Sequence, residues 1–255
     1  MRRFKWFSIA GCVSLLGLSV AQAGVFVSEK EVRRQARLEW LTMKRMMPVD
    51  PDPRVQRYVQ CVANQIINVL DKEHQALDWE VVVFDEGAIN ASANPEGKIA
   101  VFSGLLRVAD TPDSLAAVLG HEIAHATQNH AMARAKQGVR SDMLVLLGSA
   151  ATGIHPGVLR DGATIGLSLP YARDQESEAD LVGLQYMSEA GFDPRAAIYL
   201  WKNMSTANQG APPEFLSNHP SDETRLNDIV KEITPALVSY NQAREAGKRP
   251  NCQLR

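Results

Sequence analysis

Two histidines one helical turn apart, with a glutamate next to the first, constrain this chain more than any other feature of its sequence. They are His121, Glu122 and His125, in a helical pattern that begins at Thr111-Pro112 and meets no breaker before Gly138. Because each helical residue advances about 100°, the two histidines lie about 40° apart on one face. Two imidazoles placed in this way can share one zinc ion at roughly 2.0–2.1 Å each. The pattern therefore predicts a long helix that carries a metal site on one face.

The glutamate of this pattern is placed beside a bound metal rather than on it. Glu122 lies about 100° round the helix from His121. That position suits a general base that takes a proton from water whose pKa a metal has lowered towards about 7. A zinc hydrolase also needs a third protein ligand and one open position. The segment Arg173–Asp180 offers two glutamates for the place of the third ligand.

The helix expected at about 174–189 distinguishes those two glutamates. Its apolar stripe runs through Ala179, Val182, Gly183, Tyr186 and Met187. Glu176 and Asp180 fall on that stripe, whereas Glu178 is about 200° from Glu176 and faces away. We therefore predict Glu176 as the third ligand and Glu178 as a solvated surface residue. Asp180 is expected to accept a hydrogen bond from a ligand histidine and fix its tautomer, with a salt bridge to a residue such as Arg173 as the alternative.

Two further histidines differ in what their positions predict. His130 is about 140° from His125 on a continuous helix, which places it off the metal face and favours a structural role. His219 precedes Pro220, so its backbone is expected to be extended and its position well defined.

The rest of the chain has mostly helical patterns, with one short β region. Capping residues at Ser28–Glu31 and Asp52-Pro53 predict helices that run to about Met46 and Leu70. Strands are expected at 78–84, 88–93 and 98–102, the last two joined by a turn at 94–97, and later helices at about 194–207 and 222–233. Residues 151–170 hold six glycines and prolines and are expected to form a loop. The sequence predicts an α+β, mostly helical fold with a small β-sheet, as one domain over residues 28–255.

The N-terminus has the layout of a secretory signal peptide over residues 1–23. A basic start is followed by an apolar run from Trp6 to Val20 and a small-residue site at Ala21–Ala23, after which we expect cleavage. The apolar run is short for a transmembrane helix, so no stable membrane-spanning segment is expected in the mature chain. The alternatives are an uncleaved anchor and a lipoprotein anchored through Cys12.

Cysteine usage and charge narrow the class of protein further. Cys61 and Cys252 remain after the expected cleavage, and an exported chain permits a Cys61–Cys252 disulfide that ties the C-terminal tail to an early helix.

Lys and Arg number 27 against 29 Asp and Glu, with no dense basic stretch after the N-terminus. This balance argues against binding of nucleic acid.

At these residues the sequence resembles the HtpX and CAAX-prenyl-protease-type zinc metallopeptidases, metallopeptidase family 48. The pattern HExxH, followed about fifty residues later by Glu-x-x-x-Asp, is similar to that family's zinc site. Asn90–Leu106 resembles its strand region, and Asn218-His219-Pro220 with Arg225 resembles its late His-Pro segment. The resemblance covers roughly residues 50–235. It implies a gluzincin-type metalloprotease domain, with a small sheet beside the HExxH helix, that holds one Zn²⁺ through His121, His125 and Glu176.

The small exported bacterial members are the ones that this chain resembles most. That resemblance implies a periplasmic endopeptidase of misfolded or unassembled envelope polypeptides, with peripheral association with the outer membrane as a further expectation. It also implies that His219 either reaches the metal and holds the protease latent or stabilises the transition state. A substrate strand is expected to add antiparallel to an edge strand near Lys98–Phe102. The alternatives are a chaperone-like binding protein, against which the intact Glu122 argues, and an amide hydrolase of small substrates.

Overall fold

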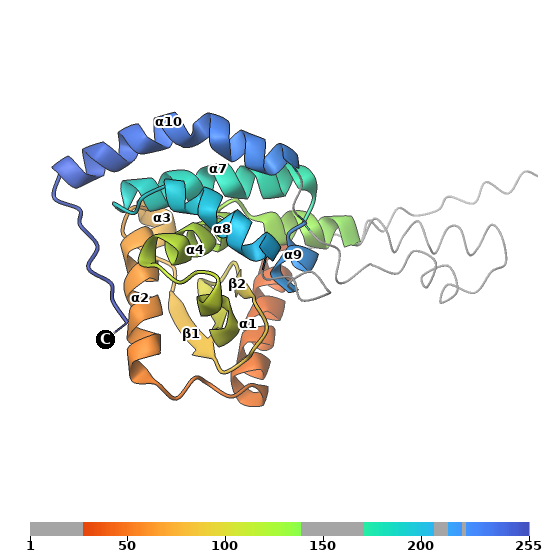
Figure 1. Cartoon of the computed structure of the whole chain (residues 1–255). Coiled ribbons are helices and arrows are strands. Elements are labelled where there is room, and N and C mark those ends of the chain that lie inside the picture. Colours follow the sequence, from red (N-terminus) through yellow and green to blue (C-terminus); the bar gives the residue numbers. More distant parts are fainter. Residues whose placement is uncertain (1–27, 139–170, 207–213, 221–222, 255) are drawn as a thin grey trace, which may run out of the picture.

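The computed structural model describes residues 28–138, 171–206, 214–220 and 223–254 (Figure 1). The expected signal peptide at 1–23, Cys12 and the Gly- and Pro-rich segment 151–170 lie outside these residues. The helices are α1 (Glu29–Met46), α2 (Pro53–Ile67), α3 (Lys72–Gln75), the 3₁₀ helix η1 (Ser103–Arg107), α4 (Pro112–Thr127), α7 (Arg173–Glu189), α8 (Arg195–Thr206), α9 (Glu214–Asn218) and α10 (Glu223–Glu245). The strands are β1 (Glu80–Phe84), β2 (Ala91–Ala93) and β3 (Lys98–Phe102).

The first helices begin where their capping residues predict. Ser28 Oγ accepts a hydrogen bond from the backbone N–H of Glu31 at the start of α1. Asp52 caps α2 in the same way, and Thr111 caps α4 through the N–H of Ser114, each ahead of a proline. These side chains satisfy N–H groups that a helix leaves unpaired in its first turn.

The three strands form one small sheet in the order β1-β3-β2. β1 runs parallel to β3, with Glu80 opposite Lys98, and β2 runs antiparallel to β3 across the predicted turn, where Gly97 has a φ of 76°. Lys98–Phe102 is the central strand, because β1 and β2 flank β3 on both sides, and the edge strand near it is β2. Within the described residues the outer side of β1 carries an isolated bridge between Val49 and Phe84, so the open edge of the sheet is β2.

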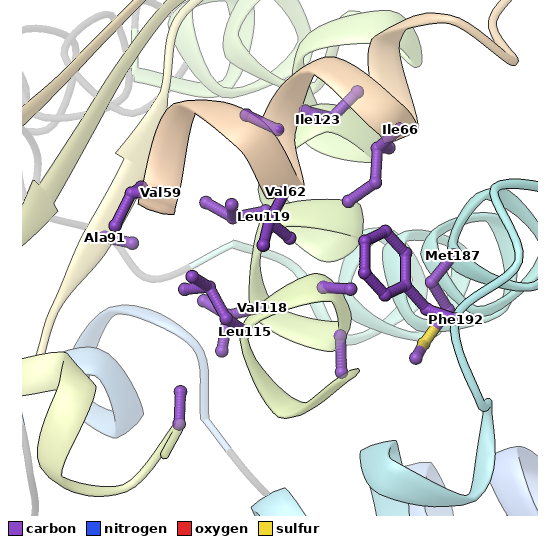
Figure 2. Packing of buried hydrophobic residues seen from close by; sticks show 14 of the residues in the cluster. Val59, Val62, Ile66, Ala91, Leu115, Val118, Leu119, Ile123, Met187 and Phe192 are labelled. Atoms are coloured by element: carbon purple, nitrogen blue, oxygen red, sulfur yellow. The ribbon is translucent and has the colours of Figure 1, made fainter. Parts of the chain in front are cut away.

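Helices cover both faces of this sheet. Trp40 of α1 packs on Phe84 and Ala100 on one face. On the other face, α2 and α4 pack together with the sheet in an apolar cluster that also reaches Met187 of α7 (Figure 2). The labelled members are Val59, Val62, Ile66, Ala91, Leu115, Val118, Leu119, Ile123, Met187 and Phe192. The sheet and α2 thus form a rigid support under α4.

The helix α4 is buried nearly all round and lies at the centre of the helical layers. It contacts α2 and β2 as well as α7, and α10 packs on α7 in turn (Figure 1). α4 and α7 approach closely at Gly120 and Gly183, where a Cβ on Gly183 would lie 2.6 Å from the backbone nitrogen of His121. A Cβ on Gly120 would lie 2.7 Å from the carbonyl oxygen of Gly183. Glycine at both positions therefore permits this helix crossing.

Several element boundaries differ from the sequence expectation. The helix expected to reach Gly138 stops at Thr127, and Asn129 has a φ of 56° before helical residues resume at 130. Asparagine tolerates this left-handed conformation because its short polar side chain can bond locally, so no glycine or proline marks the break. α10 continues to Glu245 instead of ending near 233, in spite of Pro235, because it packs along α7. The short helices α3, η1 and α9 were not predicted.

A disulfide joins Cys61 of α2 to Cys252 in the C-terminal tail, with a Cα–Cα distance of 5.6 Å and a sequence separation of 191. Within the described parts of the chain, no helix combines the length and the apolar composition that crossing a membrane requires.

The helix crossing predicts that Gly183→Ala destabilises the protein by about 1–3 kcal/mol, because the new methyl group meets backbone rather than a movable side chain. Alanine in a helix interior ordinarily stabilises relative to glycine, so the expected sign is the reverse of helix propensity. Urea unfolding of both variants measures it, with Gly87→Ala as the control, since a Cβ there meets nothing within 4 Å. Equal stability of Gly183→Ala and the unchanged chain would contradict the close crossing.

The disulfide predicts that protein cleaved after Ala23 has no free thiol before reduction and two after it, both counted under denaturing conditions. Reduction is expected to lower the free energy of unfolding by about 2–4 kcal/mol, because the bridge closes a long loop of the unfolded chain. Two free thiols in oxidised, exported protein would exclude the bridge.

Candidate metal centre

Four buried side chains from three segments converge on one point. His121 and His125 come from α4, Glu176 from α7, and His219 from the residues directly after α9, and one ligand atom of each lies within 4.8 Å of all the others. The two Nε2 atoms of His121 and His125 are 3.0 Å apart. His219 Nδ1 lies 3.1 Å from His121 Nε2 and 3.0 Å from Glu176 Oε1. The helical-face argument correctly predicted that Glu176 is buried and Glu178 exposed.

The His121 ring is oriented by a carboxylate on the next helix. His121 Nδ1 donates to Oδ1 of Asp180 at 2.9 Å, which orients the ring so that its Nε2 faces the cluster. Asp180 in turn accepts from Nε and Nη2 of Arg225 at 2.7 and 2.8 Å. Asp180 thus contacts a cluster histidine, as expected, and it also forms an ion pair with Arg225 of α10.

Arg225 is fully buried and ties several parts of the site together. Its Nη1 donates to the carbonyl oxygens of Pro220 at 2.8 Å and His219 at 3.3 Å. The same atom lies 2.7 Å from Glu176 Oε2, which makes an ion pair in which no N–H points along a hydrogen bond to that oxygen. Its guanidinium also lies 4.6 Å from the ring centroid of Trp201. Sequence reasoning singled out Arg225 only through the family resemblance and did not predict these contacts.

Glu122 faces the same cluster from α4 but is not one of its four members. Its Oε2 accepts a hydrogen bond from the backbone N–H of Ala93 in β2 at 3.2 Å. Its Oε1 lies 3.4 Å from His219 Nε2 and receives no hydrogen bond from the described residues, although it is buried. Burial raises the pKa of this carboxyl, and neighbouring histidines oppose the rise. One carboxylate oxygen is therefore held by the sheet and the other faces the cluster.

The protonation of the cluster is set by burial and by its own charges. Burial lowers the pKa of His125 to about 2, so its imidazole is neutral. Burial also acts to lower the pKa of His121, but the neighbouring carboxylates of Asp180 and Glu176 outweigh it and raise that pKa to about 9. Burial acts to raise the pKa of Glu176, yet its histidine neighbours hold it well below its usual range. The carboxylates of Asp180 and Glu176 thus favour positive charge at the point where the imidazole nitrogens meet.

His130 and Glu178 lie closer to the site than the sequence predicted. His130 Nδ1 is 2.8 Å from Nδ1 of His125, and its Nε2 is 3.3 Å from Oε2 of Glu178. The helical angle that placed His130 away from His125 assumed one continuous helix, and the break at Asn129 invalidates that assumption. Glu178 is exposed, as expected, but it contacts a residue that touches the cluster.

Two aromatic rings stack on cluster histidines, and sequence reasoning found neither. Tyr171 stacks on His125 with ring centroids 3.8 Å apart, and Phe215 stacks on His219 at 4.6 Å. Burial raises the pKa of Tyr171 to about 12, so its hydroxyl stays protonated. Each ring is distant in sequence from the HExxH helix and has no motif of its own, so only packing reveals the contact.

This donor set fits a metal cation. Imidazole nitrogens and a carboxylate oxygen are the ligands that Zn²⁺ takes in tetrahedral protein sites. Nε2 of neutral His125 and Nε2 of His121 face each other at 3.0 Å, and the two oxygens of Glu176 lie 3.4 and 3.5 Å from them. Imidazole nitrogens and a carboxylate directed at one point favour a metal cation there. The residues that would hold it are His121, His125 and Glu176, with His219 beside them.

Comparison with known proteins identifies relatives that cover most of this chain. The model of peptidase family M48 matches residues 53–233. The chain is 36% identical over 183 residues to the mitochondrial metalloendopeptidase OMA1 of Schizosaccharomyces pombe, which covers 71% of this chain and 54% of that protein. It is 31% identical over 213 residues to the beta-barrel assembly-enhancing protease of Escherichia coli, covering 76% of this chain and 43% of that protein.

A plant protein is similar to this chain to a similar degree. The mitochondrial metalloendopeptidase OMA1 of Arabidopsis thaliana is 33% identical over 176 residues, 68% of this chain and 36% of that protein. The chain therefore spans about half or less of the length of these relatives. The match of the family model includes the HExxH helix, Glu176, His219 and Arg225, the residues that build the cluster described above. By this match and this geometry, the chain belongs to peptidase family M48.

Proposed function

We propose that this chain is a zinc-dependent endopeptidase of the bacterial envelope, folded as a single domain over residues 28–255. In this proposal His121, His125 and Glu176 hold one Zn²⁺ and Glu122 is the general base. The observation that carries it is the buried carboxylate of Glu122, one oxygen of which receives no hydrogen bond from the described part of the chain, beside a cluster of three imidazoles and one carboxylate. A protein that only binds its partners has no use for such a base.

The proposed reaction is hydrolysis of a peptide bond by water. When bound, zinc supplies Lewis-acid activation of the water and of the scissile carbonyl. Glu122 takes the proton of the water at Oε1 and delivers it to the leaving amine. The N–H of Ala93 holds Oε2 of the same carboxylate, so the base is oriented by the sheet. Because burial raises its pKa, Glu122 accepts the proton more readily than an exposed glutamate does at neutral pH.

The edge of β2 is the proposed binding place for an extended substrate. Asn90 and Asn94 hydrogen-bond with β3 across the antiparallel pair, so the alternate residues Ala91 and Ala93 direct their backbone groups away from β3. Their N–H groups donate to Asn90 Oδ1 and Glu122 Oε2, so the carbonyl oxygens are the groups offered to an added strand. The N–H of Ala93 points to Glu122, which puts this edge next to the proposed base. A peptide strand added here would be recognised through its backbone, which suits substrates without a fixed sequence.

Misfolded or unassembled envelope polypeptides are the proposed substrates, and the periplasm is the proposed compartment. The signal-peptide pattern of residues 1–23 and the disulfide between Cys61 and Cys252 both support export. One relative is named a beta-barrel assembly-enhancing protease, which points to proteins of the outer membrane and to peripheral association with that membrane. The relatives named as mitochondrial belong to a compartment that this N-terminal pattern does not favour.

His219 is proposed to keep the enzyme latent in the conformation described here. Its Nδ1 is as close to His121 and Glu176 as the two cluster histidines of α4 are to each other. An imidazole at this place takes the open position that a catalytic zinc site needs. The alternative role, donation to the oxyanion of the transition state, requires His219 to move away from that position.

Replacement of Glu122 by glutamine is expected to lower the rate of proteolysis by a factor of about 10²–10⁴ and to leave zinc binding intact, because an amide keeps the shape of the side chain but cannot take the proton. Degradation of unfolded casein measures the activity, with chelator-treated protein as the blank and metal analysis as the control. Normal turnover by Glu122→Gln would refute the assignment. Binding of casein without cleavage by the unchanged chain would favour a chaperone-like function instead.

Removal of the His219 imidazole separates its two roles. If His219 holds the enzyme latent, His219→Ala should raise basal cleavage of unfolded casein at unchanged zinc content. If it donates to the oxyanion, the same variant should lower the rate by about 10²–10³. Single-turnover rates at matched zinc occupancy make the comparison. An unchanged rate would reject both roles.

A further inference from the structure

We propose that His130 is a positioning residue that orients the ligand imidazole of His125, and that Glu178 orients His130 in turn. This inference rests on the proposed zinc site and adds two residues to it. The observations behind it are a chain of contacts from His125 to the surface, the tautomers that these contacts require, and the break in the helix that brings His130 to its place.

The contacts allow one consistent arrangement of hydrogen atoms. A neutral imidazole that offers Nε2 to a metal carries its hydrogen on Nδ1. Nδ1 of His125 then donates to Nδ1 of His130 over 2.8 Å. This leaves the hydrogen of His130 on Nε2, which donates to Oε2 of Glu178 over 3.3 Å. Every donor in the series thus meets an acceptor, and the series ends on a carboxylate.

The two ligand histidines of α4 are oriented in different ways. His121 donates directly to Asp180, a buried carboxylate that Arg225 holds from the other side. On the Nδ1 side of His125, the carboxylate of Glu178 is reached through His130. His130 is 3% exposed, whereas the Glu178 side chain is 54% exposed. The series from His125 through His130 therefore ends at a carboxylate that water also reaches. Because His130 is buried and Glu178 is exposed, we expect His130 to contribute more to zinc affinity than Glu178 does.

The backbone at Asn129 makes this contact possible. On an unbroken helix, His130 would lie about 140° from His125. The left-handed φ of 56° at Asn129 breaks the helix, so the rotation of about 100° per residue no longer relates His130 to His125, and a new helical segment starts at His130. The new segment also places Arg134 4.1 Å from the ring centroid of Tyr171, the residue that stacks on His125. The segment after the break thus contacts His125 both directly and through Tyr171.

Zinc affinity of the purified, folded chain tests the proposal, measured by competition with a chromogenic chelator. His130→Leu removes the acceptor and is expected to weaken zinc binding by about 10–100-fold, the usual cost of losing such a partner. His130→Asn offers an amide oxygen near the position of Nδ1 and is expected to restore affinity to within a few-fold. Glu178→Ala is expected to weaken binding several-fold, and less than His130→Leu. The matched control is Asp174→Ala, which removes the same charge one turn earlier on α7.

The outcomes separate this inference from the proposed zinc site. Glu176→Ala should lose zinc binding, and equal binding by Glu176→Ala and the unchanged chain would refute the metal centre itself. Equal affinities of His130→Leu, His130→Asn and the unchanged chain would overturn only the role of His130. If His130→Leu does not fold, the surface variant decides, because Glu178→Ala and Asp174→Ala with equal affinity would also overturn the proposal. Absorption spectra of the cobalt-substituted variants provide a second readout, since reorientation of His125 changes the visible bands while Asp174→Ala should leave them unchanged.

Discussion

The close crossing of α4 and α7 at Gly120 and Gly183 is the constraint on which the site depends. At this separation a Cβ on either glycine would overlap with backbone of the other helix. One turn along α7, Asp180 reaches Nδ1 of His121, and one turn further Glu176 reaches the Nε2 atoms. A wider crossing would take both carboxylates out of hydrogen-bonding range, so backbone packing sets the geometry of the proposed zinc ligands.

Charge compensation is the second requirement, because the site buries several ionisable groups. An unpaired charge in such a place costs several kcal/mol, so each must meet a partner. Arg225 meets two carboxylates of α7, Asp180 and Glu176, and also binds the carbonyl oxygens of His219 and Pro220. The same arginine therefore stabilises the negative charge of α7 and fixes the segment that carries His219.

The link between sheet and helix gives the proposed base its orientation. β2 is short and lies at the open edge, and its Ala93 N–H is directed at Glu122 instead of at β3. The small side chains of Ala91 and Ala93 let this strand pack against α4. A peptide on this edge would lie beside Glu122, so the sheet serves both to bind an extended chain and to hold the general base.

Local rules were enough for the parts of this protein that depend on one segment. Capping residues located the starts of α1, α2 and α4, and helical phase distinguished buried Glu176 from exposed Glu178, because the direction of a side chain on a regular helix follows from its position alone. The strand order, the partners Arg225 and Tyr171, and the contact of His130 with His125 were decided by tertiary structure. The first three depend on how distant segments pack, and the contact of His130 depends on one left-handed residue, Asn129. Packing of distant segments and a single left-handed residue both leave no periodic signal in the sequence.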